Sequence, residues 1–161
     1  RGKIKDAIRV IMNDSEDALI KFVNDFKEVF MTLSPEEVAF PRSCNNVNKY
    51  IDSNSIYKKG TPIHVKGALI YNYNINKHKL GMKYPLIRDG DKIKFLMLKQ
   101  PNTVKDTVIS FSTKIPYEFE LHKYVDYDTQ FQKTFTDPLR FILDSIGWKL
   151  EREATLEAFF G

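Results

Sequence analysis

Two hydrophobic periodicities follow one another along this chain, and together they constrain its fold more than any other feature. Apolar side chains recur at every third or fourth position in residues 4–11 and again in residues 18–30, which is the pattern of two amphipathic helices or one interrupted helix. In residues 92–98, Ile93, Phe95 and Met97 alternate with Lys92, Lys94 and Leu98, and the β-rich run DTVISFS follows at 106–112, which predicts a hairpin or a two-stranded edge. The helical period returns in residues 124–146. The sequence therefore predicts an α+β fold that is mainly helical, with a small antiparallel β element.

Polar and Gly/Pro motifs mark where the helices are expected to begin. Asp14 or Ser15 is expected to cap the second N-terminal helix. In KKGTPIHVKG, Gly60 interrupts the chain, Thr61 can act as a cap and Pro62 suits the first helical position. A further helix is therefore expected to start at this point.

Three other stretches are less regular. LSPEEVAF at 33–40 is ambiguous, because its SPEE motif is typical of a helix start whereas residues 37–40 alternate as in a strand. NNVNKYI at 45–51 is expected to be a turn of helix or a loop. Asp-Pro at 137–138 predicts a kink or a restart in the last helix, and Gly147 is expected to end it.

The length and composition fit one domain of ordinary size. A chain of 161 residues with 42% hydrophobic residues can bury a core, and we expect one domain over 1–150 with the tail 151–161 set apart. No apolar run approaches the roughly 20 residues that a membrane helix needs, and no signal-peptide pattern is present, which predicts a soluble intracellular protein. The single Cys44 is expected to be a small packing residue. Because the first residue is Arg1 rather than Met, we expect a piece of something longer.

Positive charge is concentrated in the middle of the chain. Residues 42–83 contain eight Lys or Arg and one acid, a net charge of +7, and residues 84–114 add +3. Residues 1–41 carry −2 and residues 115–161 carry −4, so the middle holds more than the whole surplus of +4. This asymmetry favours a polyanionic partner, although lysines also keep ordinary protein surfaces solvated.

The start of the helix predicted after Gly60 is a candidate anion site. Unpaired backbone N–H groups at a helix N-terminus would there lie beside Lys58, Lys59 and His64. Neighbouring lysines should disfavour the protonated form of His64, so we expect it to hydrogen-bond phosphate rather than to act as a general base. His78 and His122 are expected to pack on the surface or in the core.

Sequence motifs typical of enzymes are weaker than the concentration of positive charge described above. Asp126 and Asp128 are spaced so that on a helix they point in different directions, and such acids more often cap a helix start than hold a metal. Ser, His and Asp are present without a nucleophile elbow, and the glycines do not match a phosphate-binding loop. An independent small enzyme is therefore the least favoured class.

Several segments resemble one family in the same order. TPIHVKGALIYNYN followed by RDGDKIKFLMLK resembles the thumb of B-family DNA polymerases, in which a histidine-containing helix precedes a Gly-Asp turn and a strand. The closer likeness is to the replicative polymerases of T-even-type phages. ALIKFVNDFKEVF resembles their long helix leaving the palm, SCNNVNKY the polar segment after it, and DYDTQFQKTFTDPLRFIL the returning C-terminal helix. ATLEAFFG resembles the terminal peptide that docks on the sliding clamp.

The resemblance implies a thumb-like, DNA-binding domain that grips primer–template duplex during phage DNA replication in the cytoplasm of the infected bacterial host. It implies contacts to the DNA backbone or minor groove from Asn45, Asn46, Lys49, His64, Lys66, Tyr71 and Asn72. Charge alone adds Lys58, Lys59 and Lys99. If five or six of these groups neutralise phosphates, log affinity should fall with log salt at a slope of roughly −4 to −5. Tyr71 is expected to be the best exception to core packing among Tyr50, Tyr57, Tyr71 and Tyr73.

The same resemblance implies what this chain lacks. The palm carboxylates that hold two metal ions, and the basic fingers helix for the incoming triphosphate, do not occur in it. No catalytic residue and no cofactor are expected in this chain, and Mg²⁺ is expected in the palm of the parent polymerase. The nucleotidyltransferase activity would belong to the parent or assembled protein, with the palm, fingers and exonuclease portion as partners.

The C-terminal tail is a candidate for binding the sliding clamp. Leu156, Phe159 and Phe160 would form one apolar knob on a single helical turn, and without the resemblance they could equally fold back onto the domain. Such a contact would be weak alone, about micromolar, and would act together with DNA binding. The alternative for the whole chain is a stand-alone nucleic-acid-binding protein of different fold that prefers single strands.

Overall fold

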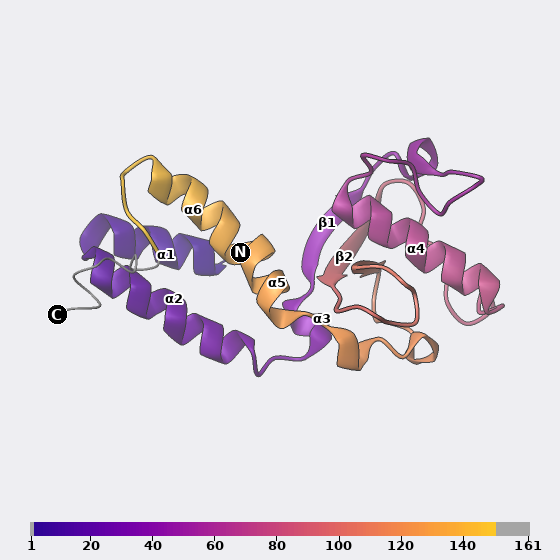
Figure 1. Cartoon of the computed structure of the whole chain (residues 1–161), viewed down its shortest axis with the longest axis horizontal. Coiled ribbons are helices and arrows are strands. Elements are labelled where there is room, and N and C mark those ends of the chain that lie inside the picture. The colour runs from indigo at the N-terminus through magenta and orange to yellow at the C-terminus, as the bar shows by residue number, and fades with distance from the viewer. Residues whose placement is uncertain (1, 151–161) are drawn as a thin grey trace. The chain divides into compact units, whose positions relative to one another are not determined.

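The computed structural model describes residues 2–150, and about half of these are helical (Figure 1). They fall into two compact units, which are described separately: the first contains residues up to Thr32 and from Phe131 onward, and the second contains Leu33–Gln130. Within the described range, none of the helices is long and apolar enough to cross a membrane. The tail at 151–161, and with it the predicted domain boundary, lies outside the described residues.

Amphipathic helices build the first unit. α1 spans Gly2–Asn13 and α2 spans Glu16–Phe30, so both predicted N-terminal helices are confirmed. Ser15 is the cap of α2, because its hydroxyl oxygen accepts a hydrogen bond of 3.2 Å from the backbone N–H of Ala18. This bond satisfies one of the N–H groups that a helix start leaves without an intrahelical partner.

An aromatic cluster forms the core of this unit. Phe26 and Phe30 of α2 lie against Phe131 and Phe135, with ring centroids between 4.9 and 6.0 Å apart and mostly tilted or edge-to-face. Such arrangements bring the positive ring edge to the negative ring face and stabilise the core beyond the area that they bury. Aliphatic side chains complete it: Ala7, Leu19, Val23, Leu139 and Leu143.

The helix predicted over 124–146 is divided in the structure. It is replaced by α5 (Tyr127–Phe131), a π-helical turn (Gln132–Thr136) and α6 (Asp137–Asp144). The predicted restart at Asp-Pro is confirmed, because Pro138 lies in the first turn of α6. Gly147 follows α6 with a φ of 76°, which suits a helix end. The expected start at residue 124 was wrong, since α5 begins at Tyr127 and Val125 forms an antiparallel bridge with Leu98.

A three-stranded antiparallel sheet lies at the centre of the second unit. Its order is β1 (Phe40–Cys44), β2 (Asp91–Met97) and β3 (Val108–Phe111). The predicted hairpin is confirmed by the pairing of Lys94 with Phe111 and of Met97 with Val108. β1 pairs along the other edge of β2 and adds a third strand to the predicted hairpin. The α+β class, mainly helical with a small antiparallel sheet, is confirmed.

The ambiguous LSPEEVAF stretch contains both structures in succession. α3 spans Pro35–Val38 and begins with a capping box, in which the Ser34 hydroxyl oxygen accepts from the Glu37 backbone N–H while the Glu37 carboxylate accepts from the Ser34 backbone. The strand alternative was wrong for residues 37 and 38, and β1 starts at Phe40. The polar stretch after it forms a 3-10 helix, η1 (Val47–Tyr50), as one of the two predicted alternatives.

Helix α4 (Ile63–Lys77) packs on this sheet and carries much of the second unit's core. Its helical structure is confirmed, but it starts one residue later than predicted, with Pro62 as the residue before the helix. The expected Thr61 cap was wrong: the Thr61 hydroxyl instead donates to the carbonyl oxygen of Lys58 at 2.5 Å. That bond closes a turn in the segment leading into α4.

A buried glutamine holds this unit together. The side-chain oxygen of Gln130 accepts from the backbone N–H of Met97 at 2.8 Å, and its nitrogen donates to the carbonyl oxygens of Val38 and Phe95, both at 3.0 Å. The residue is fully buried. It therefore connects α5, α3 and β2 through backbone groups whose own burial requires partners.

Candidate nucleic-acid interface

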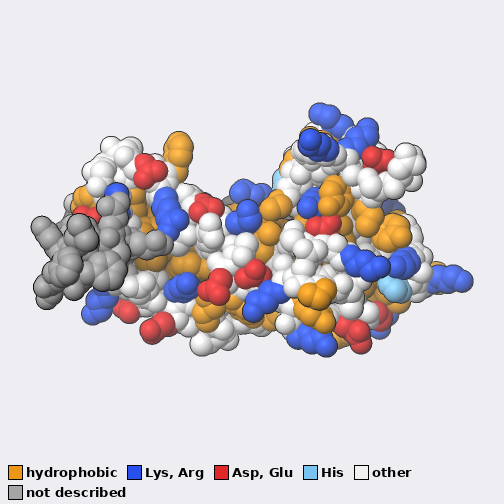
Figure 2. Space-filling model, viewed as in Figure 1, with side chains coloured by type: hydrophobic (Ala, Val, Ile, Leu, Met, Phe, Trp, Pro, Cys, Tyr) orange, Lys and Arg blue, Asp and Glu red, His pale blue; other side chains and the backbone are white. Residues whose placement is uncertain are grey.

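The exposed cations of the second unit come from separate segments. Lys49 lies in η1, Lys58 and Lys59 lie in the loop before α4, and Lys99 lies in the loop after β2; all four are exposed. Figure 2 shows Lys and Arg side chains spread over the visible face of this unit rather than gathered in one patch. Exposed lysines from several loops can contact successive phosphates of a nucleic-acid backbone without reading its sequence.

His64 lies half-buried in the first turn of α4. Burial lowers its pKa, the charge of Arg42 lowers the pKa further, and a hydrogen bond with the Ser43 backbone only partly opposes them. The predicted preference for the neutral imidazole is therefore confirmed, but its main cause is burial, with Arg42 as the charged neighbour in place of the expected lysines. The backbone carbonyl of His64 accepts from the Ser110 hydroxyl at 2.8 Å, which ties the start of α4 to β3.

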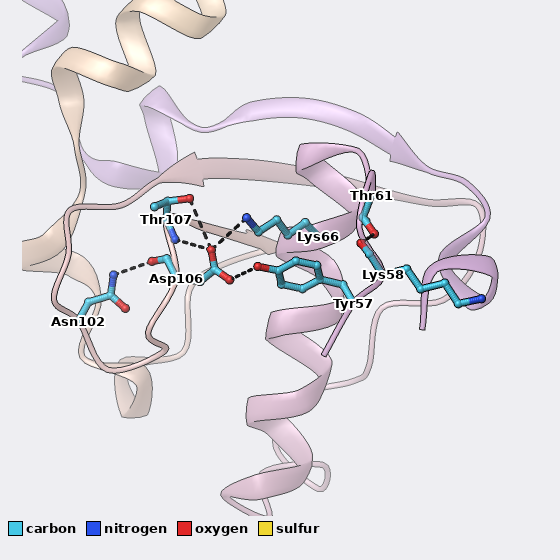
Figure 3. Close-up of polar contacts among 7 residues, drawn as sticks. All are labelled: Tyr57, Lys58, Thr61, Lys66, Asn102, Asp106 and Thr107. Atoms are coloured by element: carbon cyan, nitrogen blue, oxygen red, sulfur yellow. Dashed lines mark hydrogen bonds and ion pairs between the residues drawn. The ribbon is translucent and has the colours of Figure 1, made fainter. Parts of the chain in front are cut away.

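Lys66 belongs to a cluster of polar side chains (Figure 3). Its ammonium nitrogen lies 3.2 Å from Asp106 Oδ1 and 4.8 Å from the centre of the Tyr57 ring. The Tyr57 hydroxyl donates to Asp106 Oδ2 at 2.6 Å. Burial alone lowers the pKa of Lys66, but the hydrogen bonds with Tyr57 and Asp106 outweigh it and raise the pKa. Lys66 is thus held charged and paired inside the unit.

The loop between β2 and β3 holds Asp106 in place. The Thr107 backbone N–H donates to Asp106 Oδ1 at 2.7 Å. Asn102 donates from its side-chain nitrogen to the carbonyl oxygens of Lys99 and Asp106 at 2.8 and 2.7 Å, and its side-chain oxygen accepts from the Val104 N–H at 3.0 Å. The loop is therefore closed by its own hydrogen bonds, and the Asp106 carboxylate is fixed toward α4.

Tyr71 is buried and Asn72 is half-buried, and the side chains of both are hydrogen-bonded to protein backbone. Tyr71 is only 4% exposed, and its hydroxyl donates to the carbonyl oxygen of Pro85 at 3.2 Å. It is therefore not the expected exception to core packing, and its burial leaves no surface for a DNA contact. Asn72 exchanges two hydrogen bonds with the backbone of Ile87, at 2.8 and 2.9 Å. Both residues fasten the loop before β2 to α4.

Asn45 and Asn46 are exposed at the end of β1. Asn46 adopts a left-handed conformation with φ of 63°, which an asparagine tolerates better than most residues. The next backbone N–H, of Val47, donates to Asp89 Oδ1 at 2.9 Å. Both asparagine side chains are thus presented to solvent by a turn that is anchored on its inner side.

A groove of about 1280 Å³ lies between the loop 51–56, one face of α4 and the loop 81–89. Uncharged amide and hydroxyl groups and exposed apolar side chains line much of it, and among its charged residues are Asp52, Arg88 and Asp89. Of the predicted DNA-binding residues, it contains Asn72 alone. The groove is therefore chemically distinct from the exposed lysines described above.

The residues considered for other chemistry have structural roles. Asp126 caps α5 by accepting hydrogen bonds from the backbone N–H and the hydroxyl of Thr129, so the predicted use of these acids at a helix start is confirmed for Asp126. Cys44 is buried as predicted, and burial together with Asp89 and Asp91 raises the pKa of its thiol to about 11. Over residues 2–150, no group of three or more His, Cys, Asp or Glu residues is arranged to hold a metal ion.

The other two histidines lie at the surface. His122 stacks on the exposed ring of Tyr117, with centroids 5.3 Å apart, and its Nε2 lies 3.3 Å from a carboxylate oxygen of Glu36. His78 is exposed and follows the last residue of α4. Surface packing, as predicted for both, is confirmed.

The chain is similar over nearly its whole length to part of phage DNA polymerases. No family model matches it. It is 28% identical to the DNA-directed DNA polymerase of Enterobacteria phage T4 over 162 aligned residues, which cover 98% of this chain and 18% of the polymerase. The identity to the DNA-directed DNA polymerase of Escherichia phage RB69 is also 28%, over 98% of this chain and 17% of that protein. The chain therefore spans less than a fifth of these relatives, and the similarity supports a polymerase-related function.

Proposed function

We propose that this chain is the thumb portion of a B-family replicative DNA polymerase of the T-even phage type, and that it holds primer–template duplex behind the growing end. The observation that carries the proposal is the similarity over 98% of the chain to two phage DNA-directed DNA polymerases. Its place of action would be the cytoplasm of the infected bacterial host. A thumb of this kind slows dissociation from DNA and contributes no chemistry of its own.

The DNA contact is assigned to exposed groups of the second unit. Lys49, Lys58, Lys59 and Lys99 supply positive charge at the surface, and Asn45 and Asn46 supply amide groups that suit phosphate or the minor groove. His64 is half-buried beside the same loop and can donate one hydrogen bond as a neutral imidazole. Contacts of this type bind any duplex sequence, which is what a replicative polymerase requires.

The catalytic groups would belong to other parts of the polymerase. Phosphoryl transfer requires carboxylates that hold Mg²⁺ ions, and these are assigned to the palm of the parent protein. The palm, fingers and exonuclease portion are accordingly partners of this chain in one polypeptide or one assembly. The parent protein, rather than this chain alone, would be the enzyme.

The C-terminal tail is assigned to the sliding clamp. Leu156, Phe159 and Phe160 lie outside the described residues, and the assignment rests on their spacing and on the resemblance of ATLEAFFG to a clamp-docking peptide. Deleting residues 151–161 should abolish binding to the cognate clamp in a pull-down and leave duplex affinity within about twofold, since the tail carries no surplus of positive charge. Unchanged clamp binding would contradict this part of the proposal.

The duplex grip is tested by fluorescence anisotropy across a salt series. The full chain should bind primer–template duplex more tightly than single strands of matched length, with log affinity falling at a slope of about −4 against log salt. Lys58→Ala with Lys59→Ala should reduce the magnitude of that slope by about two. The matched control is Lys5→Ala with Lys21→Ala, which removes two exposed lysines from the acidic N-terminal region and should leave the slope unchanged.

The outcomes separate the competing functions. A preference for single strands would favour a stand-alone single-strand-binding protein, in which exposed aromatics such as Tyr73 and Tyr117 stack on bases. Equal effects of the two lysine pairs would mean that the interaction follows net charge rather than a site. Either result would overturn the assignment of the loop before α4 to duplex DNA.

A further inference from the structure

The side chains of Tyr57 and Lys66 meet at the carboxylate of Asp106 in the second unit. Tyr57 comes from the loop before α4, Lys66 from α4, and Asp106 from the loop before β3 (Figure 3). Both carboxylate oxygens are used: Oδ2 accepts from the Tyr57 hydroxyl at 2.6 Å, and Oδ1 lies 3.2 Å from the Lys66 ammonium and accepts from the Thr107 N–H at 2.7 Å. The cluster therefore leaves Asp106 little capacity for further partners.

The charged members of this cluster are poorly accessible. The side chain of Lys66 is 24% exposed and that of Asp106 is 16% exposed. A phosphate that approached Lys66 would have to replace the carboxylate or compete with its charge. Lys58 differs, because it is exposed and its side chain extends away from the cluster in Figure 3.

The loop that carries the exposed lysines is fixed on both sides of them. The Lys58 backbone N–H donates to the Tyr50 carbonyl at 2.9 Å, and the Lys58 carbonyl accepts from the Thr61 hydroxyl at 2.5 Å. Figure 3 draws Tyr57, Lys58 and Thr61 from this segment, and of these three Tyr57 is joined to Asp106. The Tyr57 hydroxyl thus connects this short segment to α4 and to the loop before β3.

We propose that Tyr57, Lys66 and Asp106 form a latch that positions Lys58 and Lys59 for phosphate contact, and that Lys66 itself does not contact DNA. The inference rests on the proposed duplex-binding function and assigns a role to residues within that site. Holding the loop in its bound conformation reduces the entropy that binding must otherwise remove, so the latch raises affinity without adding a phosphate contact. Lys66 and Asp106 also cancel each other's charge, so together they add nothing to the attraction for DNA.

The salt dependence of duplex binding distinguishes a positioning residue from a phosphate contact. A double variant, Lys66→Met with Asp106→Asn, removes both charges at once and should leave the slope of log affinity against log salt unchanged. Lys58→Ala should reduce its magnitude by about one. If the double variant also reduced it by about one, Lys66 would be a phosphate contact and the proposal would be overturned.

Tyr57→Phe tests the latch with the smallest change, because it removes one hydroxyl and keeps the ring. Duplex affinity should fall about three- to tenfold at constant slope, since the loop loses its side-chain anchor to Asp106 but not its lysines. Tyr117→Phe, at an exposed tyrosine in another part of the unit, is the matched control and should bind as the wild type does. An unchanged affinity of Tyr57→Phe would contradict the proposal.

Limited proteolysis tests the latch without DNA. Trypsin cleaves after lysine, and cleavage after Lys58 and Lys59 can be followed by mass spectrometry in the full chain. Tyr57→Phe should be cut there at least several times faster than the wild type and Tyr117→Phe at the wild-type rate, after circular dichroism has shown that all three are folded. Equal rates would overturn the latch even if duplex binding holds. If the expected difference in cleavage rate is found but the wild type does not bind duplex, only the DNA-binding function would be overturned.

Discussion

Gly67 of α4 lies directly against Ser110 of β3. A Cβ atom at position 67 would be 2.7 Å from the Ser110 backbone nitrogen and 2.9 Å from the carbonyl carbon of Ile109, and it would overlap the Ser110 hydroxyl. No side chain fits between the two backbones at this point. The helix and the strand therefore approach as closely as they do because residue 67 is glycine.

Gly67→Ala should destabilise the chain by about 1–3 kcal/mol, although alanine is the better helix former by about 1 kcal/mol. The added methyl group meets backbone atoms, which cannot move aside as a flexible side chain can. Urea denaturation followed by circular dichroism measures the change. Gly81→Ala is the matched control, because a Cβ there meets nothing within 4 Å, and its effect should stay within about 0.5 kcal/mol. A neutral Gly67→Ala would show that α4 can shift on the sheet.

Gln130→Leu should cost about 3 kcal/mol or more. It leaves the Met97 N–H and the carbonyl oxygens of Val38 and Phe95 without their side-chain partner in a buried place, and each loss of this kind costs about 1–3 kcal/mol. Gln132→Leu, at an exposed neighbouring position, should change stability little. Thermal and urea unfolding of both variants check the difference, and equal losses would mean that the hydrogen bonds of Gln130 are not the cause.

His64 should make the chain less stable as the pH falls below about 6.5. Because burial lowers its pKa in the folded state, the unfolded chain takes up this proton first. The contribution of His64 is therefore fully favourable above the unfolded pKa, decreases as pH falls, and stops changing below the folded pKa. The difference in unfolding free energy between the wild type and His64→Gln should shrink in this window. A difference that does not vary with pH would contradict the lowered pKa.

Cys44 should resist alkylation in the folded chain. With a thiol pKa of about 11, three units above a reaction pH of about 8, roughly one molecule in a thousand carries the reactive thiolate, and the side chain is buried as well. Reaction with iodoacetamide should be at least about a hundredfold slower than in urea, where the thiol has its ordinary pKa of about 8.5. Similar rates with and without urea would show that Cys44 is accessible in the native state.

Helices and strands with a regular hydrophobic period could be predicted from the sequence alone. α1 and α2 were predictable because their apolar side chains repeat with the helical period over residues 4–11 and 18–30 and because a Ser cap stands at the start of the second. The β2–β3 hairpin was predictable from alternation with lysines. β1 was not, since FPRSC is short, contains proline and shows no alternation, and it becomes a strand only through pairing with β2.

The candidate site, too, could be predicted only in part from the sequence. The excess of positive charge in residues 42–83 is a property of the sequence, and so is the similarity to phage DNA polymerases. The sequence could not show which of the ten predicted DNA-binding residues have side chains exposed to solvent. Lys58 and Lys66 are both lysines of one basic stretch, yet one is exposed and the other is paired with Asp106.

Charge and periodicity are local or additive quantities, so the sequence by itself determined α1, α2, α4, the hairpin and the mainly helical α+β class, and its charge distribution favoured a polyanionic partner. Only the tertiary structure decided that Tyr71 is buried, that Asn72 holds the Ile87 backbone and that Lys66 is neutralised by Asp106. The partners of Tyr71, Asn72 and Lys66 lie 14 to 40 residues away in the chain. Whether a polar side chain meets solvent or another residue depends on how α4, the sheet and their loops pack, and no local pattern encodes that packing.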